Sequence, residues 1–371
     1  MLGDGHMTQP VFIISTGRSG STAISNCIHA HPKLLSLSEF FLSINFHFQG
    51  NDNNRSGLSL ENWEDSDWPG LTMDHWDGKQ FWSFLAKREM KNMGPYVNKG
   101  LNVKEFLYKI TDTSRFNMKT GVPGILTMPL PHLTENPDQL YEELESVVTQ
   151  FPKDRLDRQY KRLFDWFLQR FERDVCVERS GLSVLFVDRL INMFPNAKFI
   201  FLYRDVRENA MAFNRFQGAK LGMALKKAYE STGEDPADPN SDISRLSEFK
   251  WLHPDYFEME KLEQFEVPYD VLGEFLSSSL VKAEKKLAKL PSQQVLHLRY
   301  EALTEAPQEQ LRRVIQFIHP ESSTQEENEA WVEQSASIIR SKPDTWPDLP
   351  VEKRQRLEKA SEPALKLLNY I

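Results

Sequence analysis

The run VFIISTGRSGST, from Val11 to Thr22, most constrains what this chain can fold into. Its apolar beginning, Val11–Ser15, predicts a buried strand, and the periodicity of Ser21–His29 predicts a helix directly after the glycines. Such a turn directs several backbone N–H groups at one point, where the helix dipole favours an anion. A plain tight turn capped by Ser and Thr is the alternative, but Arg18 between the glycines favours an anion site.

Further strands precede further helices along the chain. Apolar runs at Lys198–Tyr203, Gln294–Arg299 and Val175–Glu178 predict three more buried strands. Helical periodicity follows the first two of these at Arg207–Gly218 and Ala306–Ile318. Alternation of strand and helix predicts an α/β fold, with a central parallel sheet that helices flank on both faces.

The length and the insertions suggest one elaborated domain over residues 1–371. Residues 1–8, with their Gly-His-Met, are read as a cloning tag rather than as part of the fold. Residues 45–173 form a large insertion, loop-rich and then helical, and residues 231–268 form a second, acidic one. Insertions of this length often serve as lids or substrate walls, so we expect the second to lie on the acceptor side of the site.

The net charge of −8 argues against a surface for nucleic acid, which requires a basic stripe. No apolar stretch reaches the ~18 residues of a membrane span, and no signal peptide opens the chain, so a cytoplasmic protein is the default expectation. Cys27 and Cys176 lie within apolar patterns and are predicted to be buried thiols, not disulfide or metal ligands. An anionic ligand must therefore be held by a local group of residues.

The turn lacks the signature of a metal-dependent P-loop kinase. That signature places Gly-Lys-Ser/Thr at the end of the loop, whereas here Arg18 precedes Gly20 and no lysine follows. No acidic strand end that would hold magnesium is evident either. The sequence therefore predicts a phosphate-binding loop that works without a metal.

The segment STGRSGST resembles the 5′-phosphosulfate loop of sulfotransferases that use 3′-phosphoadenosine 5′-phosphosulfate (PAPS). The long segment VERSGLSVLFVDRLINMFPNAKFIFLYRDVRENAMAFNRF is similar to the same enzymes, and so are HLRYEALTEAPQEQLRRVIQFI and the final DTWPDLPVEKRQRLEKASEPALKLLNYI. The resemblance covers the first forty residues and most of 160–371, but not 45–135. It implies a P-loop-NTPase-like sulfotransferase fold of the bacterial type, with the insertions forming a lid.

The resemblance also implies roles for the loop residues. Arg18 would neutralise the charge that develops on the bridging oxygen as the sulfuryl group leaves, a use for which a fixed guanidinium is suited. The amides and hydroxyls around the phosphate would come from the rest of the loop: Thr16, Gly17, Ser19, Gly20, Ser21 and Thr22.

For the 3′-phosphate of PAPS, the resemblance points to Arg204, which follows a strand end as ligand-binding residues of open α/β sheets do. The alternative is an arginine paired with Asp205. The family usually has a serine eight residues later, where this chain has Ala212, so Asn209 or Asn214 is a possible substitute.

Three further cations are candidates. Arg179 stands where bacterial relatives carry a lysine, so it would hold the sulfuryl oxygens unless it pairs with Glu178. Arg340 and Lys342 lie where relatives close a basic loop over the nucleotide.

The acceptor hydroxyl must lose a proton, so a base is expected in the site. The resemblance favours Glu39, beside apolar Phe40 and Phe41, and His132 and His253 compete for the role. His29 and His31 have the wrong spacing for a helical metal pair and are read as structural, so no metal ligand is predicted.

The resulting hypothesis is in-line sulfuryl transfer from PAPS to a hydroxyl, with release of adenosine 3′,5′-bisphosphate and no required metal. The acceptor is a small molecule, a carbohydrate, a lipid-like alcohol or a carrier-bound acyl chain, and four tryptophans between Trp63 and Trp82 either line its cleft or merely pack. The rival hypotheses are a metal-dependent kinase or nucleotidase, and a catalytically inactive nucleotide-binding protein of the same fold.

Overall fold

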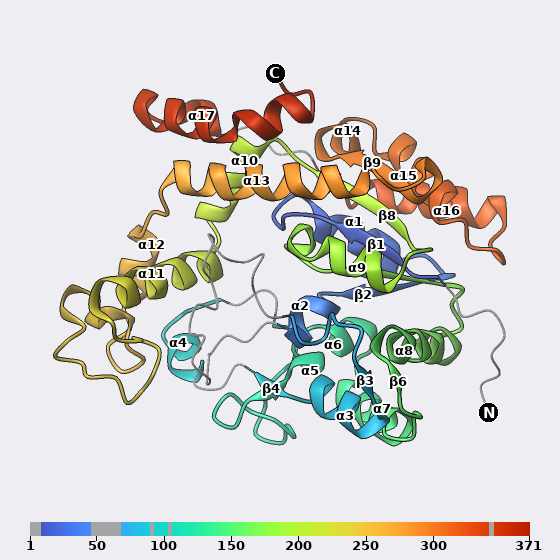
Figure 1. Cartoon of the computed structure of the whole chain (residues 1–371), viewed down its shortest axis with the longest axis horizontal. Helices are drawn as coiled ribbons and strands as arrows, with labels where there is room; N and C mark the ends of the chain where they lie inside the picture. Colours follow the sequence, from blue (N-terminus) through green and yellow to red (C-terminus); the bar gives the residue numbers. More distant parts are fainter. Residues whose placement is uncertain (1–8, 46–67, 90–92, 103–105, 341–344) are drawn as a thin grey trace.

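A five-stranded parallel sheet lies at the centre of the computed structural model, which describes residues 9–45, 68–89, 93–102, 106–340 and 345–371 (Figure 1). The order of its strands is β2-β7-β1-β8-β9. Their bounds are Val11–Ile14 (β1), Leu34–Ser38 (β2), Val175–Arg179 (β7), Lys198–Tyr203 (β8) and Val295–Arg299 (β9). The first strand is therefore central, and its carboxyl end meets those of β7 and β8.

Helices cover both faces of the sheet, which explains why the inner strands β1, β7 and β8 are almost entirely buried. In β1, Phe12 and Ile14 belong to the larger hydrophobic cluster, whereas Val11 and Ile13 belong to a second cluster on the opposite face. The second cluster is closed by α1 (Ser21–His29), α14 (Tyr300–Glu305), α15 (Pro307–Ile318) and α16 (Gln325–Ala336).

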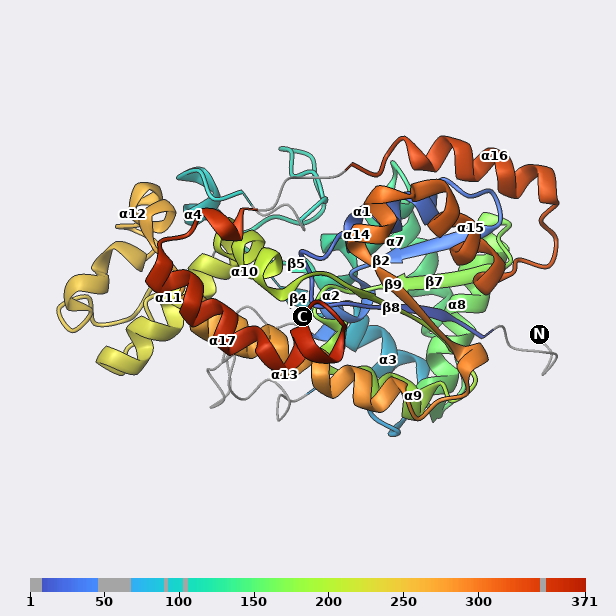
Figure 2. The same ribbon diagram turned by 90° about the horizontal axis from the view of Figure 1, so that it is seen from above.

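Part of the larger cluster is closed by helices that follow β7 and β8. They are α9 (Val187–Met193), α10 (Val206–Asn214), α13 (Tyr269–Leu287) and α17 (Val351–Leu367). The last two lie side by side in both ribbon views (Figure 1, Figure 2). Short 3₁₀ turns join several elements: η2 (Ser183–Leu185), η3 (Ser247–Leu252), η4 (Ser292–Gln294) and η5 (Trp346–Asp348).

The insertion between β2 and β7 packs against the same larger cluster. Its elements are α2 (Phe40–Asn45), β3 (His75–Trp76), α3 (Gly78–Leu85), β4 (Arg88–Glu89), α4 (Gly94–Asn98), β5 (Val122–Pro123), α5 (Gly124–Thr127), α6 (Pro129–Leu133), α7 (Pro137–Val148), β6 (Asp154–Arg155) and α8 (Leu156–Phe171). Trp68 and Trp82 are buried in this cluster and Trp76 packs against it, so these three serve packing. Trp63 lies outside the described residues.

The second insertion forms a small cluster of its own with α4. Tyr96, Leu221 and Phe249 are buried in it, and α11 (Gln217–Thr232) and α12 (Met259–Gln264) contribute to it. Figure 1 shows this part at the left, at a distance from the sheet. Within the described ranges, no helix is long and apolar enough to cross a membrane.

The predicted α/β class is confirmed, with two differences in detail. The strand β2 was not predicted, because LLSLS is short and only partly apolar, yet it forms an edge of the sheet. The single helix predicted at Arg207–Gly218 is wrong: α10 ends at Asn214, and α11 begins at Gln217 and continues to Thr232.

Candidate active site

The turn between β1 and α1 forms a loop whose backbone requires glycine. Gly17 has φ +73°, Arg18 φ +53° and Gly20 φ +92°, all in the left-handed region. A Cβ on Gly20 would also lie 2.4 Å from Cδ2 of Tyr300, at the start of α14. The glycine at position 20 therefore serves both the backbone conformation and the close approach of the tyrosine ring.

The same loop presents hydrogen-bond donors without acceptors in the described part of the chain. No backbone hydrogen bond there uses the N–H groups of Ser19, Gly20, Ser21 or Thr22. The hydroxyl of Ser19 is completely buried and also has no partner among these residues. Together with the dipole of α1, these donors make the loop suited to an anion.

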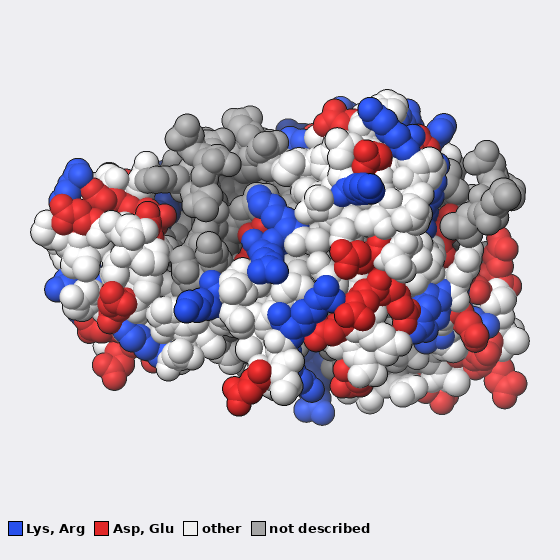
Figure 3. Space-filling model, turned by 90° about the horizontal axis from the view of Figure 1, so that it is seen from below, with Lys and Arg blue, Asp and Glu red and all other residues white. Residues whose placement is uncertain are grey.

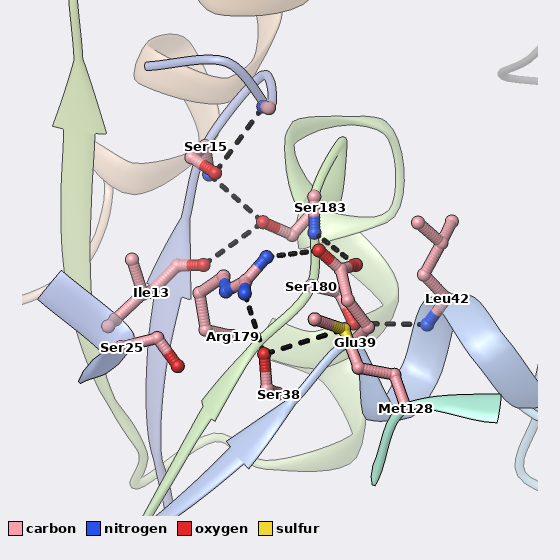
Figure 4. Close-up of polar contacts among 12 residues, drawn as sticks. Ile13, Ser15, Ser25, Ser38, Glu39, Leu42, Met128, Arg179, Ser180 and Ser183 are labelled. Carbon is pink, nitrogen blue, oxygen red and sulfur yellow. Dashed lines mark hydrogen bonds and ion pairs between the residues drawn. The ribbon is translucent and has the colours of Figure 1, made fainter. Parts of the chain in front are cut away.

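Buried side chains from other elements hold the loop in place. The Ser183 hydroxyl accepts from the amide of Ser15 at 2.9 Å and donates to the carbonyl of Ile13 at 3.1 Å (Figure 4). Asn209 on α10 donates to the carbonyl of Gly17 and to the hydroxyl of Thr16, both at 3.1 Å. Because these partners come from the loop after β7 and from α10, the conformation of the loop depends on three segments distant in sequence.

The predicted catalytic Arg18 is partly exposed in this loop. Its guanidinium carbon lies 5.1 Å from the centre of the Phe216 ring, between α10 and α11. A cation over an aromatic face is attracted by the ring, which limits where the guanidinium can point. The structure thus brings Arg18 together with the predicted loop residues Thr16, Gly17 and Ser19 at the carboxyl end of β1.

Glu39 and Arg179 form a buried ion pair at the ends of β2 and β7 (Figure 4). The other carboxylate oxygen of Glu39 accepts from the amide of Gly181 at 2.8 Å, and Arg179 also donates to the Ser38 hydroxyl at 2.6 Å. Gly181 in turn packs against Gly17 of the loop. Glu39 therefore contacts Gly181, the residue that packs on the loop after β1, and Arg179 is joined to it through Glu39.

The alternative pairing of Arg179 with Glu178 is not the ion pair that the structure shows. The carboxyl of Glu178 accepts instead from the Ser180 hydroxyl and from the amide of Phe41. Burial raises the pKa of Glu178 to about 8, with the charge of Glu39 adding to the effect. The site thus holds two adjacent buried carboxyls, of which only Glu39 is paired with a guanidinium.

Arg204 follows the end of β8, as predicted, and is only 7% exposed. Its guanidinium pairs with Glu208 at 3.4 Å and lies 4.6 Å from the centre of the Tyr300 ring, which packs on Gly20. The alternative partner, Asp205, instead caps α10 and pairs with Arg207 at 2.6 Å. Arg204 is therefore linked to the loop through one aromatic ring.

The chain offers no hydroxyl where the family's serine is expected. Ala212 is partly exposed on α10. Asn214 is unsuited to replace the serine, since its amide forms two 2.8 Å hydrogen bonds with the backbone of Val267. Asn209 faces the loop instead. Of the basic residues expected near the nucleotide, Arg340 is exposed and Lys342 lies outside the described residues.

The candidate histidines occupy three different environments. His132 is hydrogen-bonded to the Ser36 hydroxyl at 3.2 Å and packs on His29, and burial lowers its pKa to about 3. His253 is buried in the second insertion, where its ring accepts from the amide of Asp255. His31 bonds to Asn328 and to the amide of Lys33, which supports the structural role predicted for it.

Metal ligands do not gather anywhere among the residues that the structure describes. Cys27 and Cys176 are buried free thiols, as predicted. Figure 3 shows that Lys and Arg side chains nevertheless gather near the middle of one face of this acidic protein. Local positive charge therefore coexists with the negative net charge.

Three residues that shape the site were not predicted from the sequence. Tyr300 packs on the loop, Ser183 supports β1, and Glu208 accepts from the backbone amide of Trp346 at 2.7 Å. Each acts through a tertiary contact between segments far apart in the chain. The one available signal was the four-residue spacing between Arg204, which precedes α10, and Glu208 in the first turn of that helix.

Comparison with known proteins gives a clear family match. A model of the sulfotransferase family matches residues 10–273. No curated protein sequence matches the chain. Among solved structures, the sulfotransferase domain from the curacin biosynthetic pathway is 14% identical, with a TM-score of 0.38 and coverage of 95% of this chain and 96% of that one.

Two bacterial sulfotransferases are similar at the same level. The one from Mycobacterium avium is 13% identical, with a TM-score of 0.43 and coverage of 99% of this chain and 78% of that one. The one from Alicyclobacillus acidocaldarius is 12% identical, with a TM-score of 0.33 and coverage of 97% and 98%. Because the family model spans well over half of the sequence, the chain belongs to the sulfotransferase family.

Proposed function

We propose that this protein transfers a sulfuryl group from PAPS to a hydroxyl of an acceptor and releases adenosine 3′,5′-bisphosphate. The observation that carries the proposal is the loop after β1, where the amides of Ser19 to Thr22 and the buried Ser19 hydroxyl have no acceptor among the described residues and Arg18 directly precedes them. These donors and this cation fit the 5′-phosphosulfate end of PAPS.

The 3′-phosphate would be held by Arg204. Its buried guanidinium lies near the loop through Tyr300, which supports one nucleotide spanning both. Glu208 and Ala212 set limits on this contact, since the carboxylate competes for the guanidinium and the alanine donates nothing. The basic segment that includes Lys342 is proposed to supply further charge.

During transfer, the acceptor oxygen forms a bond to sulfur as the bond from sulfur to the bridging oxygen breaks. The leaving oxygen gains negative charge, which Arg18 would neutralise, and removal of one such interaction commonly costs a factor of 10²–10³ in turnover. Arg179 would orient the sulfuryl oxygens. Positioning and electrostatics supply the catalysis, without a covalent intermediate.

Glu39 is the proposed base for the hydroxyl proton. Its carboxylate accepts from the amide of Gly181, which packs on the loop, whereas His253 is buried in the second insertion. His132 is a weaker alternative, because a group whose pKa is lowered to about 3 has little affinity for a proton. Accepting a proton would require Glu39 to loosen its pairing with Arg179.

The test is a transfer assay with sulfur-labelled PAPS and a panel of hydroxyl acceptors: phenols, sugars, long-chain alcohols and hydroxyacyl thioesters. Wild type should label at least one class, and Arg18→Ala should lower kcat at least 100-fold. Arg356→Ala, which removes a 58%-exposed arginine on α17, is the matched control and should retain full turnover.

Equal turnover of Arg18→Ala and wild type would contradict the role of Arg18. Donor binding without transfer to any acceptor would favour an inactive nucleotide-binding protein, a reading that Ala212 and the Arg204–Glu208 pair favour.

A further inference from the structure

We propose that Asn209 is a positioning residue that fixes the peptide between Gly17 and Arg18 and with it the conformation of the anion-binding loop, an inference that rests on the proposed function. Asn209 is 0% exposed on α10, five residues after Arg204. It therefore reaches the loop from the neighbouring βα unit, and its contacts are with the loop itself.

Both hydrogens of the Asn209 amide have acceptors. The nitrogen donates to the carbonyl oxygen of Gly17 and to the hydroxyl of Thr16, each at 3.1 Å. The Thr16 hydroxyl in turn donates to the same carbonyl at 3.2 Å. A carbonyl oxygen only accepts hydrogen bonds, so it fixes which end of the amide faces the loop.

This contact sets the orientation of the peptide that joins Gly17 to Arg18. In a planar trans peptide, the C=O and the following N–H point in opposite directions. Because the Gly17 carbonyl is directed at Asn209, the N–H of Arg18 is directed away from α10. The left-handed φ angles of Gly17 and Arg18, +73° and +53°, belong to the same fixed conformation.

The carbonyl oxygen of the Asn209 side chain argues against a direct contact between this residue and a phosphate. The Asn209 carbonyl oxygen is buried and has no hydrogen-bond partner among the described residues. A phosphate requires donors, and both donor hydrogens are already used on the loop. Asn209 therefore does not replace the serine that is absent at Ala212, and its effect on the nucleotide passes through the loop.

The experiment compares two nucleotides that differ only in the 3′-phosphate: adenosine 3′,5′-bisphosphate and adenosine 5′-phosphate. Calorimetry gives the Kd of each for wild type, Asn209→Asp and Asn209→Ala. Loss of the buried hydrogen bonds should raise both Kd values by the same factor, about tenfold for Asn209→Ala. Asn209→Asp should raise them more, because its carboxylate faces the Gly17 carbonyl.

Asn214→Ala is the matched control. It removes another buried asparagine of α10, one that binds the backbone of Val267 and not the loop, so both Kd values should remain within twofold of wild type. Thermal unfolding of each variant confirms that the protein used is folded. If Asn209→Asp does not fold, the uncharged Asn209→Ala still decides the question.

Two results would overturn the inference. A raised Kd for the bisphosphate alone would show a direct contact with the 3′-phosphate, and unchanged Kd values for both nucleotides would show that the loop does not depend on Asn209. Failure of the proposed function looks different, since wild type itself would then bind neither nucleotide.

Discussion

Replacing Gly20 with alanine tests the geometry of the anion-binding loop through protein stability. The residue caps α1 with φ +92°, and an added Cβ would lie 2.4 Å and 2.6 Å from two ring carbons of Tyr300. Gly233, at the end of α11, has φ +72° but no atom within 4 Å of an added Cβ. The two glycines therefore separate backbone strain from steric overlap.

The free energy of unfolding that Gly20→Ala is expected to lose is the sum of two contributions. A left-handed conformation costs a residue with a Cβ about 1–2 kcal/mol, and forcing an extra carbon into a packed place costs about 1–3 kcal/mol. Gly20→Ala should therefore lower the free energy of unfolding by about 2–5 kcal/mol. Gly233→Ala should show only the cost of the left-handed conformation, about 1–2 kcal/mol.

Urea unfolding, followed by circular dichroism, measures both variants. The double variant Gly20→Ala/Tyr300→Ala should be more stable than the sum of the two single effects predicts, by at least ~1 kcal/mol, because the small residue at 300 removes the overlap. The reasoning is refuted if Gly20→Ala costs no more than Gly233→Ala, or if the double variant shows no coupling.

Two further predictions concern the buried carboxyls. The pKa of Glu178 is raised from 4.5 to about 8, so the folded protein retains a proton that the unfolded chain releases in this range; wild-type stability should fall by up to ~1.4 kcal/mol per pH unit as the pH rises through that window. Urea unfolding at pH 5, 6.5 and 8 should show that the free energy of unfolding of Glu178→Gln lacks this part of the pH dependence. If wild type and variant instead show the same pH dependence, Glu178 does not titrate in this range. Glu39→Gln should lower kcat at least 100-fold while the Kd of adenosine 3′,5′-bisphosphate changes less than threefold, and an undiminished kcat would move the base to another residue.

The strand, turn and helix that make up the candidate anion-binding loop were predictable because their signals are local. An apolar strand, glycines with left-handed φ and the start of a helix all lie within Val11–Thr22, and the structure has them in that order. The strands β1 and β8 were predictable for the same reason, since each is buried on both faces and so reads as a continuous apolar run.

The partners of the site residues were not predictable, because they are tertiary contacts between distant segments. The neighbouring Glu178 was the expected alternative partner of Arg179, yet the guanidinium of Arg179 pairs with Glu39, which directly follows β2. Asp205 was likewise the expected alternative partner of Arg204, but Arg204 precedes α10 and pairs with Glu208 in the first turn of that helix. The packing of Tyr300 on Gly20 has no local signal at all.

The central claim is that the loop binds the nucleotide of PAPS without a metal, and calorimetric titration tests it most directly. The purified chain is titrated with adenosine 3′,5′-bisphosphate in the presence of EDTA, and separately with ATP and magnesium. Selective binding of the bisphosphate, with a Kd on the order of micromolar, is the predicted result. Preference for ATP with magnesium would contradict the account and favour a metal-dependent kinase.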